Sequence, residues 1–220
     1  MEDPLIQAIA VHALPVIFAI TLHEASHGYV AKRFGDLTAY AQGRVSLNPI
    51  RHIDPFGTVV LPLMTLAIGG IMFGWAKPVP VNFGNLRQPK QDMLWVAAAG
   101  PAANFVMALG WALVAKAAGT AGAASWSEFF YAMGLAGVRV NIIFMVLNLL
   151  PLPPLDGSKI AISLLPRNLA YQYAALEPYG IYLLLGLIVL EGVLHVPLLS
   201  LILFPLYEAV RGVIAALFNL

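Results

Sequence analysis

The sequence predicts an all-α polytopic membrane protein, with about five transmembrane helices plus a re-entrant, extended β-like region at 37–82. Of its 220 residues, 60% are hydrophobic and 10% are charged, whereas a soluble domain carries about 25% charged residues. The mean hydropathy of +0.81 agrees. Five apolar segments account for the spans, at 5–31, 92–118, 128–150, 179–194 and 197–218. Almost nothing is left over for a soluble domain.

Composition also excludes several classes of function. The chain has no cysteine, which excludes disulfides and thiolate metal ligands and leaves His, Asp and Glu as possible ligands. A net charge of +1 indicates no nucleic-acid partner. The start, Met-Glu-Asp-Pro, lacks the basic region of a cleavable signal peptide, so the first apolar segment is expected to remain.

The first apolar segment contains the motif His23-Glu24-Ala25-Ser26-His27. On a helix, histidines four residues apart lie on one face, where both imidazoles can reach one metal ion. Zinc is the usual occupant of such a pair. Glu24 points off that face, which suits a residue that acts on a metal-bound water. The motif is common by chance, and its position inside a membrane segment is what makes it informative.

A catalytic zinc usually has three protein ligands, so a third ligand is needed. A third histidine six residues after His27 is excluded, because Arg33 stands there. The remaining candidates are Asp36, His52, Asp54 and Asp156. Asp156 is favoured, because it follows an apolar helix in a proline-rich segment from which a carboxylate can project into a cavity. The alternative is that Asp156 caps a helix beginning near Ser158; Asp54 is expected to be a turn or cap residue.

Basic residues predict the topology. Lys and Arg lie on both sides of the segment 56–76, and basic loops favour the cytoplasm. A spanning segment cannot have both ends on one side, so 56–76 is predicted to be re-entrant. Asp156 then lies on the same side of the membrane as His23 and His27; if 56–76 crossed, it would lie on the far side. The same count places the N-terminus outside and the C-terminus in the cytoplasm.

Two segments near the motif are expected to be non-helical. Residues 37–48 mix Thr, Tyr and Val with Gly43 and favour extended chain or a short hairpin. The sequence Lys77-Pro78-Val79-Pro80-Val81-Asn82 must be extended, because a residue before proline avoids the helical region. The polar stretch 158–175 is expected at the membrane interface.

Three blocks in this order resemble the site-2 protease family of intramembrane zinc metalloproteases. They are HEASH at 23–27, GPAAN at 100–104 and NLLPLPPLDG at 148–157. The chain is similar to the small prokaryotic members that carry the stretch FGWAKPVPVN, here 73–82, without the PDZ or CBS domain of some relatives. The resemblance implies a single membrane-embedded protease domain over 1–220, with a catalytic core at 5–160 and C-terminal helices at 178–218.

The resemblance also implies roles for individual residues. His23, His27 and Asp156 would bind one zinc ion per chain, and Glu24 would be the general base. Asn104 and Asn148 would line the site, where an amide donor from Asn148 could stabilise the oxyanion. Asn104 and Asn148 could instead join helices.

Extended segments after the motif would hold an unwound substrate by strand addition. The candidate edge is 43–48, which includes Gly43, Arg44, Val45 and Ser46; the alternative is a plain interfacial hairpin.

The expected function is therefore an intramembrane zinc metalloendopeptidase that hydrolyses peptide bonds in transmembrane segments of other membrane proteins. It would be an integral protein of a prokaryotic plasma membrane, with its active site toward the cytoplasmic side. Two alternatives remain: a relative that binds membrane helices without cutting them, and an ion-conducting protein with buried His, Asp and Asn along its path.

Overall fold

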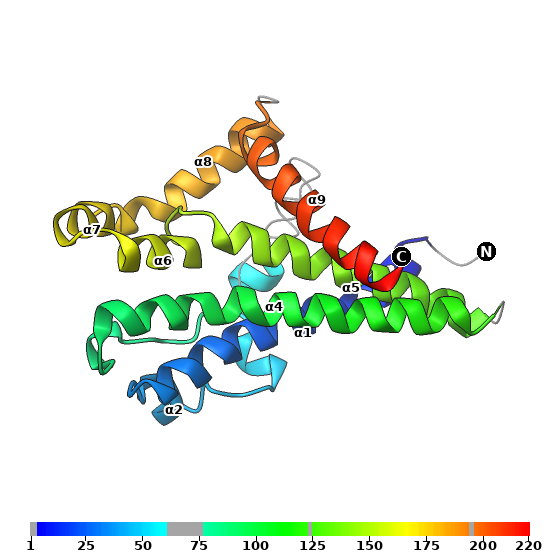
Figure 1. Cartoon of the computed structure of the whole chain (residues 1–220), viewed down its shortest axis with the longest axis horizontal. Coiled ribbons are helices and arrows are strands. Elements are labelled where there is room, and N and C mark those ends of the chain that lie inside the picture. The colour runs from blue at the N-terminus through cyan, green and yellow to red at the C-terminus, as the bar shows by residue number, and fades with distance from the viewer. Residues whose placement is uncertain (1–3, 61–76, 123–124, 194–195) are drawn as a thin grey trace.

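The computed structural model describes residues 4–60, 77–122, 125–193 and 196–220, and it is built from helices (Figure 1). Five helical segments are long and apolar enough to cross a membrane: Ile6–Arg33, Pro89–Thr120, Trp126–Leu149, Arg167–Gly192 and Leu198–Phe218. The all-α membrane fold expected from the composition is thereby confirmed.

The main helices follow the apolar segments closely. The long helices are α1 (Pro4–Arg33), α4 (Pro89–Thr120), α5 (Ser125–Leu149), α8 (Gly180–Gly192) and α9 (Leu198–Phe218). The short elements are α2 (Thr38–Ala41), η1 (Pro49–His52), η2 (Pro55–Val60), η3 (Phe83–Asn85), α6 (Asp156–Leu164), α7 (Arg167–Ala174) and η4 (Glu177–Tyr179).

Helices α4 and α5 lie along the length of the molecule and pack closely, with α1 against both (Figure 1). Small residues make this possible, because they let helix backbones approach in lipid. A Cβ atom at Gly134 of α5 would lie 2.6 Å from the backbone nitrogen of Ala115 in α4. One at Gly137 would lie 2.2 Å from the ring of Trp111. This tight three-helix core fixes the position of α1, which carries the histidine motif.

The direction of α9 differs from the sequence-based expectation. Near its start, Leu199 packs with Leu150 and Leu155, which lie between the end of α5 and the start of α6. Near its end, Ile214 packs with Ala108 and Ala112 of α4. Helix α9 therefore runs toward the end of the molecule where α1 begins (Figure 1).

Helix α1 thus begins, and α9 ends, toward the same end of the molecule, whereas five successive antiparallel crossings would separate the two termini. The sidedness of the termini stays a prediction. Helix α8 alone has 13 residues and rises only about 20 Å, less than the membrane core of about 30 Å. The membrane-length segment Arg167–Gly192 therefore includes α7 and η4 as well. Helix α9 continues from α8 toward the end of the molecule where α1 begins, instead of turning back antiparallel to α8.

The described residues of 37–82 form turns, short helices and irregular chain. Thr38–Ala41 forms α2, where extended chain was expected, and the described residues of this region contain no strand. The segment 77–82 is free of helix, as its prolines predict. Most of the predicted re-entrant segment, 61–76, lies outside the described residues. Its two flanks meet, because the Lys77 N–H donates to the His52 carbonyl over 2.9 Å, and a re-entrant segment requires ends that lie together.

Candidate metal centre

Helix α1 places both histidines of the motif on one buried face. His23 is 6% exposed and His27 is 9% exposed. Their Nε2 atoms lie 3.1 Å apart, as expected for residues one helical turn apart. Glu24 is half-buried on the adjoining face and lines the cavity described below. Helix α1 therefore places the two histidines on one face and Glu24 off that face, as expected from their spacing.

The third ligand candidate reaches this face from α6. The Asp156 Oδ2 atom lies 3.1 Å from His23 Nε2 and 3.3 Å from His27 Nε2. The close turn before α6 depends on Gly157, because a Cβ atom there would lie 2.2 Å from the Leu150 carbonyl oxygen. The alternative role as a helix cap does not apply, since Leu155 is the N-cap residue and no side chain caps the helix.

Hydrogen bonds at the Nδ1 atoms orient both imidazoles. His23 Nδ1 lies 2.6 Å from Asn104 Oδ1, and His27 Nδ1 lies 2.7 Å from the Val96 carbonyl oxygen. Because both partners are acceptors, the Nδ1 atoms carry the protons and the Nε2 atoms present lone pairs. This is the arrangement that zinc-binding histidines use.

The orientation of Asn104 is itself fixed. Its Nδ2 donates to the Ala19 carbonyl over 3.2 Å and to Asn141 Oδ1 over 3.0 Å. Asn141 in turn donates to the Gly137 carbonyl over 2.8 Å. Asn104 and Asn141 are both fully buried. Asn104 thus supports His23 from behind and lies outside the cavity lining, so it joins α1, α4 and α5 as well as contacting the site.

Gly100 of α4 leaves room beside the two imidazoles. A Cβ atom at this position would come within 2.5 Å of His27 Nε2 and 2.6 Å of His23 Nε2. An alanine there would therefore occupy the space that faces both lone pairs. The Gly of the GPAAN block provides the open position that a bound ion requires.

The three ligand atoms fit zinc. Tetrahedral zinc with ligand bonds of about 2.0–2.1 Å separates its ligand atoms by about 3.3 Å, close to the three distances of 3.1–3.3 Å in this cluster. Asp156 Oδ2 is buried and receives no hydrogen bond from the described residues. Three converging lone pairs repel one another unless a cation lies between them. Among the described residues, His23, His27 and Asp156 form the one such cluster of His, Asp and Glu.

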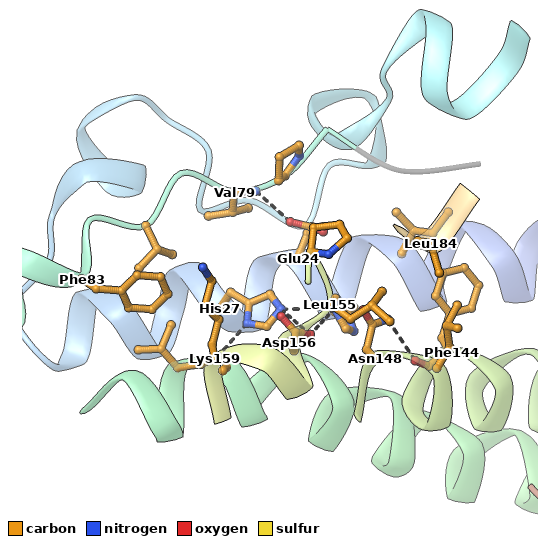
Figure 2. Close-up of a pocket in the computed structure, with 18 of the residues that line it drawn as sticks. Glu24, His27, Val79, Phe83, Phe144, Asn148, Leu155, Asp156, Lys159 and Leu184 are labelled. Carbon is orange, nitrogen blue, oxygen red and sulfur yellow. Dashed lines mark hydrogen bonds and ion pairs between the residues drawn. The ribbon is translucent and has the colours of Figure 1, made fainter. Parts of the chain in front are cut away.

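The cluster opens onto a cavity of about 550 Å³ between α1, α5, α6 and the segment 78–83 (Figure 2). Its lining is mainly apolar, with the polar side chains of Glu24, Asn148 and Lys159. Glu24 Oε2 accepts a hydrogen bond of 2.7 Å from the Val79 N–H. Asn148 Nδ2 donates to the Phe144 carbonyl over 2.9 Å, which leaves its second amide hydrogen for another acceptor. The cavity thus combines a carboxylate and an amide beside the metal ligands.

The other three ligand candidates lie elsewhere and have their own partners. Asp36 accepts hydrogen bonds from Thr38, Asn82 and Asn85. His52 contacts the Ser46 carbonyl. Asp54 accepts from the Phe56 and Gly57 amides, as a turn residue does. The preference for Asp156 among the four agrees with this arrangement.

The candidate substrate edge at 43–48 forms turns and bends and lies outside the lining of the metal cavity. Gly43 has φ +64° and its carbonyl accepts from Arg51. Arg44 donates to the carbonyls of Lys77 and Pro78. Val45 lies against Gly28 of α1, and Ser46 Oγ accepts from the Asn48 amide. Strand addition at this segment stays a prediction, because its carbonyls at 43 and 46 already have partners.

Several contributors were not assigned from the sequence. Asn141 was visible as a polar residue within a span, but its partner on α4 could not be inferred from the chain alone. The Val96 carbonyl and the Val79 amide are main-chain groups, for which side-chain patterns give no signal. The contact of Gly100 with the imidazoles depends on how α4 packs on α1, although the surrounding small residues do indicate close packing.

This fold and site define a class, a membrane-embedded metalloprotease with a His-Glu-x-x-His helix, and comparison with known proteins agrees. The profile of Peptidase family M50 matches residues 110–190. A protein of Bacillus subtilis named "Putative zinc metalloprotease YwhC" is 38% identical over 209 residues, covering 94% of this chain and 90% of that protein. The "Putative zinc metalloprotease Rip2" of Mycolicibacterium smegmatis is 33% identical over 165 residues, 74% of this chain and 54% of that protein.

The chain belongs to peptidase family M50, the site-2 protease family. It is a zinc metalloprotease and an integral membrane protein. The resemblance noted from the three sequence blocks is thereby confirmed. No solved structure matches the chain.

Proposed function

We propose that this protease hydrolyses peptide bonds within transmembrane segments of other membrane proteins. The observation that carries the proposal is the depth of the ligand cluster. His23 and His27 lie within the membrane-length helix α1, and α4 and α5 cover them. His23 is ten residues from the end of α1 at Arg33, which corresponds to about 15 Å along the helix. A peptide bond must therefore enter the bilayer region to reach the site.

The chain's own residues provide the chemistry. His23, His27 and Asp156 would hold zinc, which supplies a polarised carbonyl and an activated water when bound. Glu24 takes the proton from the attacking water and passes it to the leaving amine. Asn148 offers an amide hydrogen to the developing oxyanion. The apolar cavity wall excludes bulk water and strengthens each of these interactions.

The distribution of basic residues supports the proposed orientation in the membrane. Lys32 and Arg33 stand at the end of α1 nearest the histidines, and basic residues mark the cytoplasmic side. The proposed active site therefore faces the cytoplasmic half of a prokaryotic plasma membrane. Helix α1 begins on the opposite side.

The test is cleavage of reporter transmembrane segments by the purified protein in detergent, with the metal content measured for each variant. Glu24→Gln is expected to retain zinc and lose cleavage. Asp156→Ala is expected to lose both. Glu208→Gln changes a half-buried carboxylate that is paired with Arg211 on α9, and it serves as the control that retains both. Cleavage by Glu24→Gln at the wild-type rate would end the proposed mechanism, and full zinc occupancy in Asp156→Ala would end the ligand assignment.

A further inference from the structure

The segment Pro78-Val79-Pro80 contains a single backbone donor. Proline has no amide hydrogen and fixes its own φ, so Val79 alone can donate within this triplet. Its N–H donates to Glu24 Oε2 over 2.7 Å (Figure 2). Two prolines thus present one main-chain amide to the carboxylate beside the metal ligands.

Helix α1 has a face shaped to receive this segment. Glu24 and Gly28 are one turn apart and lie on the same face of the helix. A Cβ atom at Gly28 would lie 3.1 Å from Val79 Cγ1 and 2.9 Å from Val45 Cγ2. Val79 is 7% exposed, so its side chain is buried where it packs against α1. The missing side chain at Gly28 therefore lets the Val79 amide come within reach of Glu24.

Two side chains fix the segment on either side of Val79. The Arg44 guanidinium donates to the Lys77 carbonyl over 2.8 Å and to the Pro78 carbonyl over 3.2 Å. The carboxylate of Asp36 accepts the Asn82 N–H over 2.7 Å. The amide between these contacts is held in place before any substrate binds, so it is preorganised toward Glu24.

Glu24 itself is left with one available oxygen. Within the described part of the chain, the Val79 amide is the hydrogen-bond partner of its Oε2, and Oε1 has none. A hydrogen bond to a carboxylate is among the stronger kinds, and it restricts rotation of a side chain that is otherwise flexible. The geometry therefore selects one oxygen of Glu24 for proton transfer.

We infer that the main-chain amide of Val79 is a positioning group for Glu24, and that Arg44 acts through it by clamping the segment. The inference deepens the proposed function and rests on the role of Glu24 as general base. The segment KPVPVN at 77–82 would then position Glu24 for catalysis, in addition to forming one wall of the cavity. Arg44, which was expected from the sequence to hold substrate, would instead hold this segment in place.

The test compares proline substitutions in one segment. Val79→Pro removes the amide that contacts Glu24. Val81→Pro inserts the same residue two positions later, where the described contacts include no hydrogen bond from the amide, and Val79→Ala keeps the amide while shortening the side chain. The purified zinc-loaded protein is assayed in detergent with a reporter transmembrane segment. Since a positioning hydrogen bond contributes about tenfold or more to rate, Val79→Pro is expected to lower kcat at least tenfold further than either control, with KM and zinc content kept within about threefold.

Arg44→Ala provides a second, independent measurement, because it loosens the segment while the amide remains. It is expected to lower kcat with KM unchanged. A rise in KM alone would assign Arg44 to substrate binding and overturn the inference. Equal effects of Val79→Pro and Val81→Pro would also overturn it, as would loss of zinc from Val79→Pro. Failure of the proposed function is a separate result, because then the wild-type protein itself would not cleave the transmembrane reporter in the same assay.

Discussion

At the scale of single residues, the pair Asn104 and Asn141 determines how His23 presents its lone pair. Asn104→Ala removes the acceptor for His23 Nδ1–H, and loss of such a partner typically weakens metal binding about 10–100-fold. We expect this loss in zinc affinity, measured by competition with a chelator. Asn168→Ala, an exposed position on α7, is the control. Unchanged affinity in Asn104→Ala would contradict a role for Asn104 in orienting His23.

Asn141→Ala is expected to weaken zinc binding less than Asn104→Ala, because Asn141 acts one hydrogen bond further away and the Ala19 carbonyl still holds Asn104. Since the two side chains belong to one network, the double variant should lose less affinity than the sum of the single losses. Strict additivity in this double-mutant cycle would show that the two residues act separately. The same zinc competition measures all three variants.

Gly100 offers a sharper test of the same centre. Gly100→Ala places a Cβ atom within 2.5–2.6 Å of both Nε2 atoms, so we expect loss of zinc binding and of cleavage. Gly110→Ala is the matched control on the same helix, because nothing lies within 4 Å of a Cβ atom there. It is expected to retain zinc. Zinc content by elemental analysis distinguishes the two variants, and normal zinc content in Gly100→Ala would contradict the site geometry.

The residues that sequence alone could place were those with a periodic or chemical signature. His23 and His27 are one turn apart on any helix, and Asp156 was one of few acids near an apolar helix end. The Val96 carbonyl and Gly100 have no such signature, because their roles arise from the register of α4 against α1. That register depends on how the small residues of the two helices pack together, and it cannot be predicted from the spacing of residues along the chain.

At the scale of elements, Asp36 ties the end of α1 to the segment that lies over the cavity. It is 1% exposed and accepts from the Thr38 backbone and hydroxyl, the Asn82 amide and the Asn85 side chain. Burial alone would raise the pKa of Asp36, but the hydrogen bonds from Thr38, Asn82 and Asn85 outweigh it and hold the pKa below its ordinary value. Deprotonated Asp36 therefore stabilises the folded state.

The sign of the pH dependence follows. A lowered pKa in the folded state means that the contribution of Asp36 is complete above the ordinary Asp pKa of about 3.9 and is lost as the pH falls through the lower folded value. We expect Asp36→Asn to destabilise the protein near neutral pH and to differ less from wild type in acid. Thermal unfolding in detergent between pH 2.5 and 6 measures both. A difference that stays constant with pH would contradict this assignment.

Element boundaries were well predicted where hydrophobicity was continuous and poorly predicted where it was not. The expected 92–118 and 128–150 became α4 and α5 with shifts of at most three residues. Thr38–Ala41 formed a helix where extended chain was expected, because a four-residue segment carries too little periodicity. The direction of α9 differs from the expected one, because counting spans treats 179–194 as a separate straight crossing, whereas α8 has only 13 residues.

At the scale of the whole molecule, the metal centre joins parts that are distant in the chain. His23 and His27 lie on α1 and Asp156 lies on α6, with α4 between them providing the Val96 carbonyl and the space at Gly100. Helix α9 packs on the same α4–α5 core. The sequence-based prediction of one domain over 1–220 therefore leads to the expectation of a single cooperative unfolding transition.

Removal of zinc is expected to shift that transition as a whole. A ligand bound to the folded state alone stabilises it by about 4 kcal/mol at a thousandfold excess over its Kd. Chelation should therefore lower the Tm of the wild-type protein in detergent, and added zinc should restore it. Asp156→Ala should unfold at nearly the same temperature with and without zinc, because its third ligand is gone, whereas Glu24→Gln should keep the full shift. A zinc-independent Tm for the wild type would mean that the ion contributes to chemistry alone; an equal shift in Asp156→Ala would mean that the stabilising ion binds elsewhere.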